Sequence, residues 1–166
     1  MEQVILLSQT GALSVITAWL FLGVRDNILY PLQNRQLTDI VLCMQALSEE
    51  YPEIYAELSY RKITSTDLQK RLFHIIVAAE VMICLVLAVA ILVLLGAVIG
   101  AVPAERAQPL ALLGALGFTM IWAGFLVAGN HFAYWLCHKD LQLTHYQMTL
   151  WGLGTMIFIL IGHLSL

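Results

Sequence analysis

Residues 81–104 read VMICLVLAVAILVLLGAVIGAVPA and contain no Asp, Glu, Lys or Arg. An α-helix needs about 20 consecutive apolar residues to cross the hydrocarbon layer of a bilayer. This uncharged run of 24 residues is therefore long enough to span a membrane once.

Three further stretches share this lack of charge and have 22, 32 and 26 residues, at 3–24, 107–138 and 141–166. Each is long enough for one crossing, and none is long enough for two crossings joined by a turn. The pattern predicts an all-α, four-helix transmembrane bundle that forms a single membrane domain over residues 1–166. The predicted spans are 4–24, 70–102, 110–137 and 145–164.

The composition also indicates that lipid, and not water, surrounds the chain. The chain of 166 residues is 60% hydrophobic and 11% charged, with a mean hydropathy of +0.83, whereas soluble domains carry about 25% charged residues. Too few charged side chains are present to cover a water-soluble fold of this size. The net charge is −3 and no basic stripe occurs, so the lipid bilayer is the expected partner and nucleic acid is not.

Residues 32–64 are predicted to form a helical extramembrane cap between the first two spans. Apolar residues recur there at helical spacing, with polar residues between them, at Leu37, Ile40, Val41, Met44 and Leu47. Tyr51-Pro52 breaks this amphipathic helix. We expect the cap to lie on the membrane surface or over the bundle, although an ordinary soluble loop would differ only in what its apolar face touches.

The distribution of basic residues predicts an orientation. Four crossings put both termini on the same side. Seven Lys and Arg residues lie on the side of the long loop, against Arg106 alone on the other side. The positive-inside rule would then place the long loop in the cytoplasm.

Glu80 is the most informative polar residue, because it lies within the apolar run 72–102. A carboxylate at the centre of the bilayer costs on the order of 3 kcal/mol, so an intramembrane Glu is a functional candidate that needs a partner facing the bundle. An equally weighted interpretation makes Glu80 a structural residue at the membrane boundary, hydrogen-bonded to Asn27, Asn130 or His131.

The histidines at the same end of the spans suggest metal, haem or quinone binding. His131 and His138 are about 10 Å apart along a helix, too far to bind one metal ion together. The candidate metal ligands are therefore Glu80, His74 and His131. Polar anchoring at the interface is the favoured role for these histidines.

No Ser-His-Asp spacing, phosphate-binding loop or dinucleotide-binding fingerprint occurs in the chain. The sequence accordingly identifies no catalytic residue, and the favoured interpretation is that the chain has no enzymatic activity on its own.

Three stretches carry a resemblance to a known family: Asn27-Ile28-Leu29-Tyr30 followed by Val41-Leu42-Cys43-Met44; Arg61-Lys62-Ile63-Thr64-Ser65 leading to Glu80; and Gly124-Phe125 followed by Gly129–Trp135. With these motifs the chain resembles a bacterial family of predicted small integral membrane proteins of unknown function. Asn130-His131 stand where that family's pattern has an acidic residue.

The resemblance implies a four-helix fold in the bacterial inner (plasma) membrane and no known activity. It would place the long loop in the periplasm, opposite to the count of basic residues. The residues predicted to contact a ligand or partner, from both lines of reasoning, are Asn27, Arg61, His74, Glu80, Asn130, His131, Trp135 and His138.

Two functional hypotheses follow. The leading one is an accessory or scaffolding subunit of a membrane complex, which presents residues 25–71 to another membrane-protein subunit. The alternative is a quinone-, haem- or metal-binding protein with a one-sided site around Glu80 and His131, beneath the cap. The sequence assigns no cofactor.

Overall fold

The computed structural model describes residues 1–164, and the described residues contain no β-strand. Four helices are long and apolar enough to cross a membrane: α1 (Glu2–Leu29), α5 (Thr66–Val98), α6 (Ala104–His131) and α8 (Lys139–Leu164). The prediction of an all-α bundle with four spanning helices is therefore confirmed.

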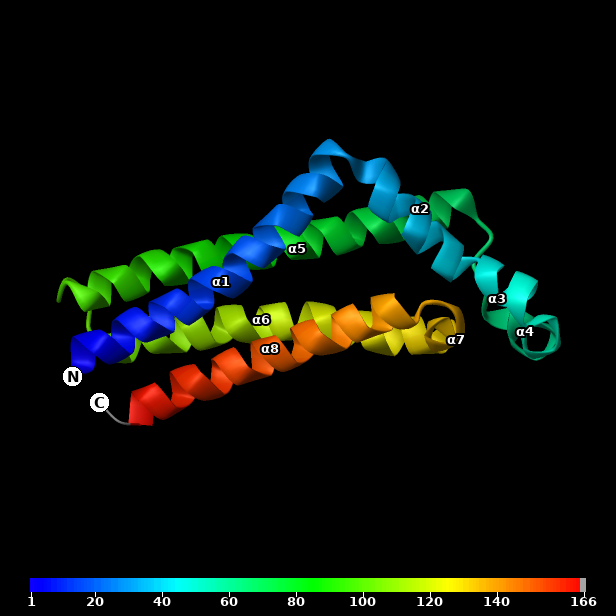
Figure 1. Cartoon of the computed structure of the whole chain (residues 1–166). Coiled ribbons are helices and arrows are strands. Elements are labelled where there is room, and N and C mark those ends of the chain that lie inside the picture. The colour runs from blue at the N-terminus through cyan, green and yellow to red at the C-terminus, as the bar shows by residue number, and fades with distance from the viewer. Residues whose placement is uncertain (165–166) are drawn as a thin grey trace.

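The four long helices form one elongated bundle (Figure 1). α1 lies along α5, and α6 packs against both α5 and α8. Apolar side chains from all four helices fill its centre, among them Leu13, Leu20, Leu87, Phe118 and Ile159. Gly152 of α8 lies so close to α6 that a Cβ atom there would collide with Thr119. Such small residues allow the backbones of membrane helices to approach closely.

The end of the bundle opposite the cap is closed by a buried chain of hydrogen bonds that joins α1, α6 and α8. Gln9 Nε2 donates to the carbonyl of Ile159 over 3.0 Å, and Gln108 Nε2 donates to Gln9 Oε1 over 3.1 Å. His163 Nδ1 lies 2.6 Å from Gln108 Oε1 and is the donor of that bond. Gln9 and Gln108 are fully buried. Because an unpaired polar group is costly in an apolar interior, this chain holds the three helices together.

Two Tyr-Pro pairs shape the cap. Proline has no backbone N–H and disfavours helical geometry in the residue before it. Tyr30 and Tyr51 accordingly leave the helical region with φ values of −132° and −135°. The chain restarts as helix at each proline, giving α2 (Pro31–Leu42), α3 (Gln45–Glu50), α4 (Pro52–Leu58) and the short 3₁₀ helix η1 (Ser59–Arg61).

α1 does not stay with the bundle along its whole length. It begins beside α5 and α8 and then swings away from α8, and α2 turns back towards α5 (Figure 1). The turn between α1 and α2, residues 28–32, therefore projects sideways from the bundle; we call it the α1–α2 corner.

The third long helix differs most from its predicted limits of 110–137. α6 already begins at Ala104, because Pro109 lies early in the helix and removes only one of its hydrogen bonds. The helix ends at His131, since Ala133 adopts the left-handed conformation with φ of 53° and reverses the chain. The short helix α7 (Tyr134–Cys137) follows.

Candidate functional site

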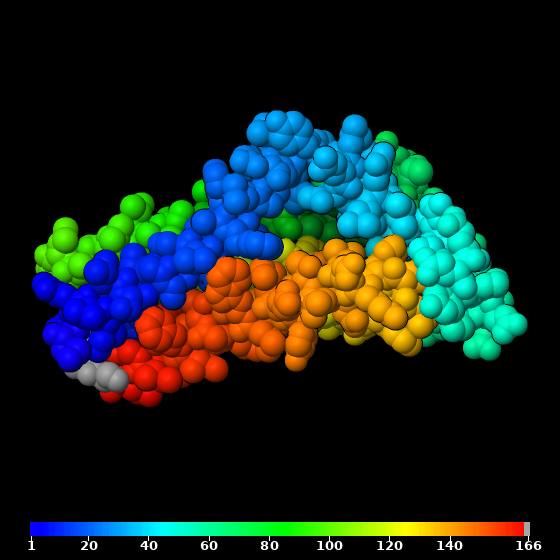
Figure 2. All heavy atoms as spheres, viewed as in Figure 1, coloured from blue at the N-terminus to red at the C-terminus, as the bar shows by residue number. Residues whose placement is uncertain are grey.

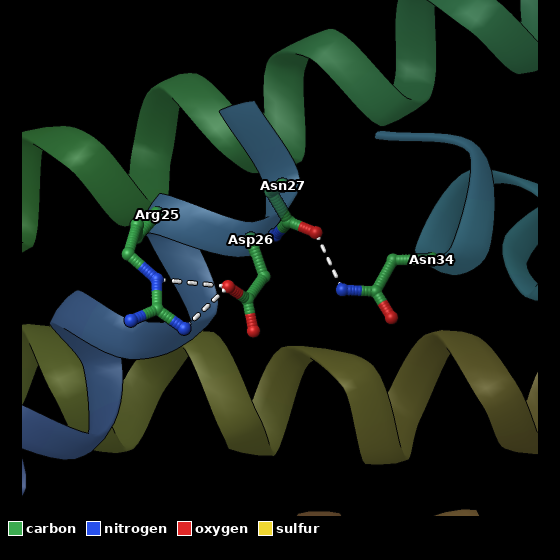
Figure 3. A network of polar contacts seen from close by, with 4 residues as sticks. All are labelled: Arg25, Asp26, Asn27 and Asn34. Atoms are coloured by element: carbon green, nitrogen blue, oxygen red, sulfur yellow. Dashed lines mark hydrogen bonds and ion pairs between the residues drawn. The ribbon is translucent and has the colours of Figure 1, made fainter. Parts of the chain in front are cut away.

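Glu80 of α5 is held by a short chain of side-chain amides. Asn27, in the last turn of α1, donates from Nδ2 to Glu80 Oε2 over 2.7 Å. Asn34 of α2 donates in turn to Asn27 Oδ1 over 2.6 Å (Figure 3). Glu80 is 6% exposed and Asn27 8%. Of the three hydrogen-bond partners that the sequence left open for Glu80, the structure selects Asn27.

A cavity of about 310 Å³ lies beside this chain of amides. Figure 2 shows a hollow between α2 and α8 with α5 at its floor. The polar residues of its lining are Asn27, Asn34, Thr38, Glu80, Tyr134, Thr144 and His145, and its aromatic residues include Phe73, Trp122, Phe125 and Phe132. The cavity is thus mostly apolar, with a few polar groups on its walls.

Only one of the two carboxyl oxygens of Glu80 accepts a hydrogen bond from the described residues. Oε2 accepts the bond from Asn27, whereas no described residue donates to Oε1. Glu80 belongs to the cavity lining, so its carboxyl group is a candidate position for contact with a bound molecule. No Lys or Arg of residues 1–164 belongs to the lining. The site can therefore exchange hydrogen bonds with a ligand but offers no fixed positive charge to an anion.

The opposite wall is an aromatic cluster around His145 of α8. Its ring centroid lies 5.7 Å from that of Trp122 and 5.0 Å from that of Phe125. Tyr134 stacks on it at 5.9 Å, with its hydroxyl 3.4 Å from His145 Nδ1. Burial raises the pKa of the Tyr134 hydroxyl above its ordinary value.

The turn after α6 brings Tyr134 into this cluster. A Cβ atom at Gly129 would lie 2.6 Å from the Tyr134 ring, so only glycine allows the ring to pack there. The sequence reasoning did not include Tyr134 or His145 among the predicted site residues. The available signal was that His145 is the first residue of the predicted span 145–164, at the same end of the spans as the other candidate histidines.

The model of the family "Predicted small integral membrane protein (DUF2165)" matches residues 5–161. The chain belongs to this family. Membership confirms the resemblance seen in the sequence and, with the four apolar helices, identifies a multi-pass integral membrane protein. No curated protein and no solved structure matches the chain.

In this family member, two of the predicted site residues, Asn27 and Glu80, meet at the cavity. The other six do not line it: Arg61, His74, Asn130, His131, Trp135 and His138. Arg61 Nη1 instead donates to the backbone carbonyl of His131 over 3.1 Å, which joins η1 to the end of α6. Asn130 Oδ1 lies 3.5 Å from Gln142 Nε2.

The proposed metal ligands are not assembled into one site. His74 and His131 are exposed, while Glu80 is buried against Asn27. Within residues 1–164 no three His, Cys, Asp or Glu side chains come together in a group that could hold a metal ion. The polar groups that do converge are those of the cavity, whose chemistry is hydrogen bonding in apolar surroundings.

Proposed function

We propose that this membrane protein binds one lipid-soluble molecule with a quinone-type ring as its head group, in the cavity between α2 and α8. The observation that carries the proposal is that Glu80, a buried residue of the cavity lining, has one carboxyl oxygen bonded to Asn27 and the other without a donor among the described residues. A mostly apolar cavity with a few directed polar groups is the usual form of a small-molecule site.

The size of the cavity favours a single ring. Its volume of about 310 Å³ is about twice that of the roughly 150 Å³ engineered cavity that binds benzene. One substituted ring fits such a space, whereas the much larger haem macrocycle does not. The hollow opens on the side of the bundle (Figure 2), so an isoprenoid tail can leave towards the lipid.

The polar groups of the walls favour a neutral head group. A phospholipid phosphate would meet Glu80 without a compensating Lys or Arg from the described lining. A quinol hydroxyl can donate to Glu80, and a quinone carbonyl can accept from it when it is protonated. The ring nitrogens of His145 on the opposite wall provide a second hydrogen-bonding position for a ring with two oxygen atoms.

This function also supports a membrane location. Quinones dissolve in the bacterial inner membrane, which is where the proposal places the chain. α1 begins and α8 ends at the same end of the bundle, which supports termini on a common side of that membrane (Figure 1).

Tryptophan fluorescence tests the proposal, because Trp122 lines the cavity and quinones quench indole fluorescence. The reporter variant keeps Trp122 alone and carries Trp19→Phe, Trp135→Phe and Trp151→Phe. A short-tailed ubiquinone analogue added to this variant in nanodiscs should quench Trp122 saturably. Adding Glu80→Leu should weaken the saturable part at least about tenfold, because the ligand loses a hydrogen bond to a charged or strongly polar group.

The matched control keeps Trp151 alone. Trp151 stacks edge-on against Trp19 at 6.2 Å and does not line the cavity. We expect only the linear quenching that comes from quinone dissolved in the lipid. Equal quenching curves for the two reporter variants would overturn the proposal. An absorption spectrum and metal analysis of the purified protein test for haem and metal. A stoichiometric amount of either would contradict a quinone as the ligand.

A second candidate function is that of an accessory or scaffolding subunit. It is supported by α3, α4 and η1, which extend beyond the end of α6 (Figure 1) and expose Tyr51, Ile54 and Tyr60, the last to 75%. Aromatic side chains on such a projecting surface are typical of protein contacts. Purification in mild detergent tests this role, because a stable chain that carries a bound ligand and no partner would argue against it.

A further inference from the structure

The α1–α2 corner exposes an unusual amount of apolar surface for a turn. Ile28, Leu29, Tyr30 and Leu32 are exposed to 58%, 60%, 62% and 65%. These exposed fractions show that the rest of the cap does not cover the four side chains. A contiguous apolar patch of this kind indicates contact with a partner or a membrane rather than with water.

The charged side chains around the corner are paired within it. Residues 25–39 contain two basic and two acidic residues, which gives a net charge of zero. Arg25 donates from both Nε and Nη2 to Asp26 Oδ1, at 2.9 and 2.8 Å (Figure 3). Arg35 Nε lies 3.6 Å from Asp39 Oδ2. Removing a charged side chain from water costs less free energy when the charge is paired than when it is alone. This segment is therefore suited to the boundary between water and lipid.

The position of the corner matches that boundary. It projects sideways from the bundle rather than beyond its end (Figure 1). Phe21 of α1 is 55% exposed and lies seven residues before Ile28, which puts the two side chains on the same face of the helix. The apolar surface of the corner therefore continues the lipid-facing surface of the first span. Tyr30 adds an aromatic ring with a polar tip, which is typical of the interface.

We propose that the α1–α2 corner is embedded in the membrane, at the boundary between acyl chains and head groups, and that α2 lies in the plane of this boundary. The partner is the lipid bilayer itself. The hollow between α2 and α8 then opens to acyl chains and not to water, whatever molecule the cavity holds. This inference does not depend on the quinone proposal.

Nitroxide accessibility in proteoliposomes tests the position of the corner. A chain with Cys43→Ala, Cys84→Ala and Cys137→Ala receives a single spin label at Leu32→Cys, and collisions with oxygen and with a water-soluble nickel chelate are measured. Oxygen concentrates in lipid and the chelate stays in water. We expect the oxygen-to-nickel collision ratio at position 32 to be several-fold higher than that of a water-exposed label.

Two control positions of similar exposure calibrate the ratio. Tyr60→Cys lies on η1, where the native side chain is 75% exposed, and should report water. Leu92→Cys lies in the uncharged part of α5, is 68% exposed, and should report lipid. A ratio at position 32 equal to that at position 60 would overturn the proposal. Low collision rates with both reagents would place a protein against the corner and would also overturn it.

Photocrosslinking keeps the proposal testable if the cysteine-free chain does not fold. A benzophenone amino acid at position 32 of the otherwise native chain should give lipid adducts that mass spectrometry detects. The same amino acid at position 60 should give none. Absence of lipid adducts at position 32, while position 92 forms them, would contradict an embedded corner.

Discussion

The two ends of the bundle use buried polar side chains in opposite ways. At the closed end, Gln9, Gln108 and His163 bond to one another and to the Ile159 carbonyl. At the cap end, the chain of amides stops at Glu80, a residue of the cavity lining whose second carboxyl oxygen accepts no hydrogen bond from the described residues. Polar groups that bond only to each other stabilise a fold, whereas one that keeps bonding capacity towards a cavity can recognise a ligand. The difference locates the candidate site.

Close packing of α8 against α6 should give the largest effect on stability. Gly152→Leu places a side chain against Thr119, including its backbone, and should cost about 3 kcal/mol of unfolding free energy through overpacking. The matched control is Gly154→Leu, because a Cβ atom at Gly154 meets nothing within 4 Å. Unfolding of both variants in bicelles provides the measurement. Equal losses would contradict the packing described for α6 and α8.

Breaking the hydrogen bonds at the closed end should have the next largest effect. Gln108→Leu leaves Gln9 Oε1 and His163 Nδ1 without their partner, at a cost of about 2 kcal/mol of unfolding free energy. The double variant Gln9→Leu with Gln108→Leu should recover part of this loss, since a pair of apolar groups leaves fewer polar atoms unpaired. Thermal unfolding of the single and double variants compares them, and strictly additive losses would argue against a linked chain.

The same kind of change at the cap end should matter less for stability. Glu80→Leu leaves Asn27 Nδ2 without its acceptor but also removes a carboxyl group whose burial is costly, so we expect a net loss below about 1 kcal/mol of unfolding free energy. Its main effect should be on ligand binding, as described above. If Glu80→Leu destabilised the protein as much as Gln108→Leu, the two ends would not differ in the way proposed.

The smallest effect concerns the thiol of Cys137 in α7, which packs against α3 of the cap. Burial raises its pKa, and the nearby carboxylate of Glu50 raises it further. Only the thiolate reacts with maleimide, so labelling should be slow at neutral pH and accelerate as the pH rises. Glu50→Gln removes the second cause, lowers the pKa and should speed labelling about twofold at a fixed pH, by the loss of one partly screened charge.

The labelling chain carries Cys43→Ala and Cys84→Ala, so that the rate belongs to Cys137 alone. Glu57→Gln is the control, because it removes the same charge elsewhere in the cap. If both variants accelerated labelling equally, the cause would be a general change of charge and not the proximity of Glu50 in α3 to Cys137 in α7.

The sequence predicted the membrane fold because hydropathy along a chain is a one-dimensional property. It also gave Asn27 as one of three partners for Glu80, since residues that flank spans at the same end lie at similar depth. It could not choose among them, because the choice depends on how α1 tilts away from α8. His131 was placed with Glu80, but the helix ends there and the left-handed Ala133 turns the chain, which leaves His131 exposed.

The residues that the sequence missed are mostly uncharged. The spans were identified by their lack of charged residues, and glutamine carries no charge. The sequence pattern therefore gave no indication that Gln9 and Gln108 form buried hydrogen bonds. Tyr134 and His145 reach the cavity through a turn that needs Gly129, and a close contact between a glycine and a ring is not visible in a pattern of hydropathy. Side-chain convergence across helices requires their tilt and rotation, which composition does not contain.

The length of α5 has a consequence for whatever meets the cap. Its 33 residues rise about 50 Å, whereas the hydrocarbon layer is about 30 Å thick. The surplus lies at the end that carries Asp67, Lys70 and Arg71, because the opposite end is uncharged. The part of α5 that extends beyond the hydrocarbon layer therefore sets the distance of α3 and α4 from the lipid. A molecule or protein that docks on them is held at a set distance from the bilayer, and shortening α5 by whole turns would lower that height in steps of about 5.4 Å.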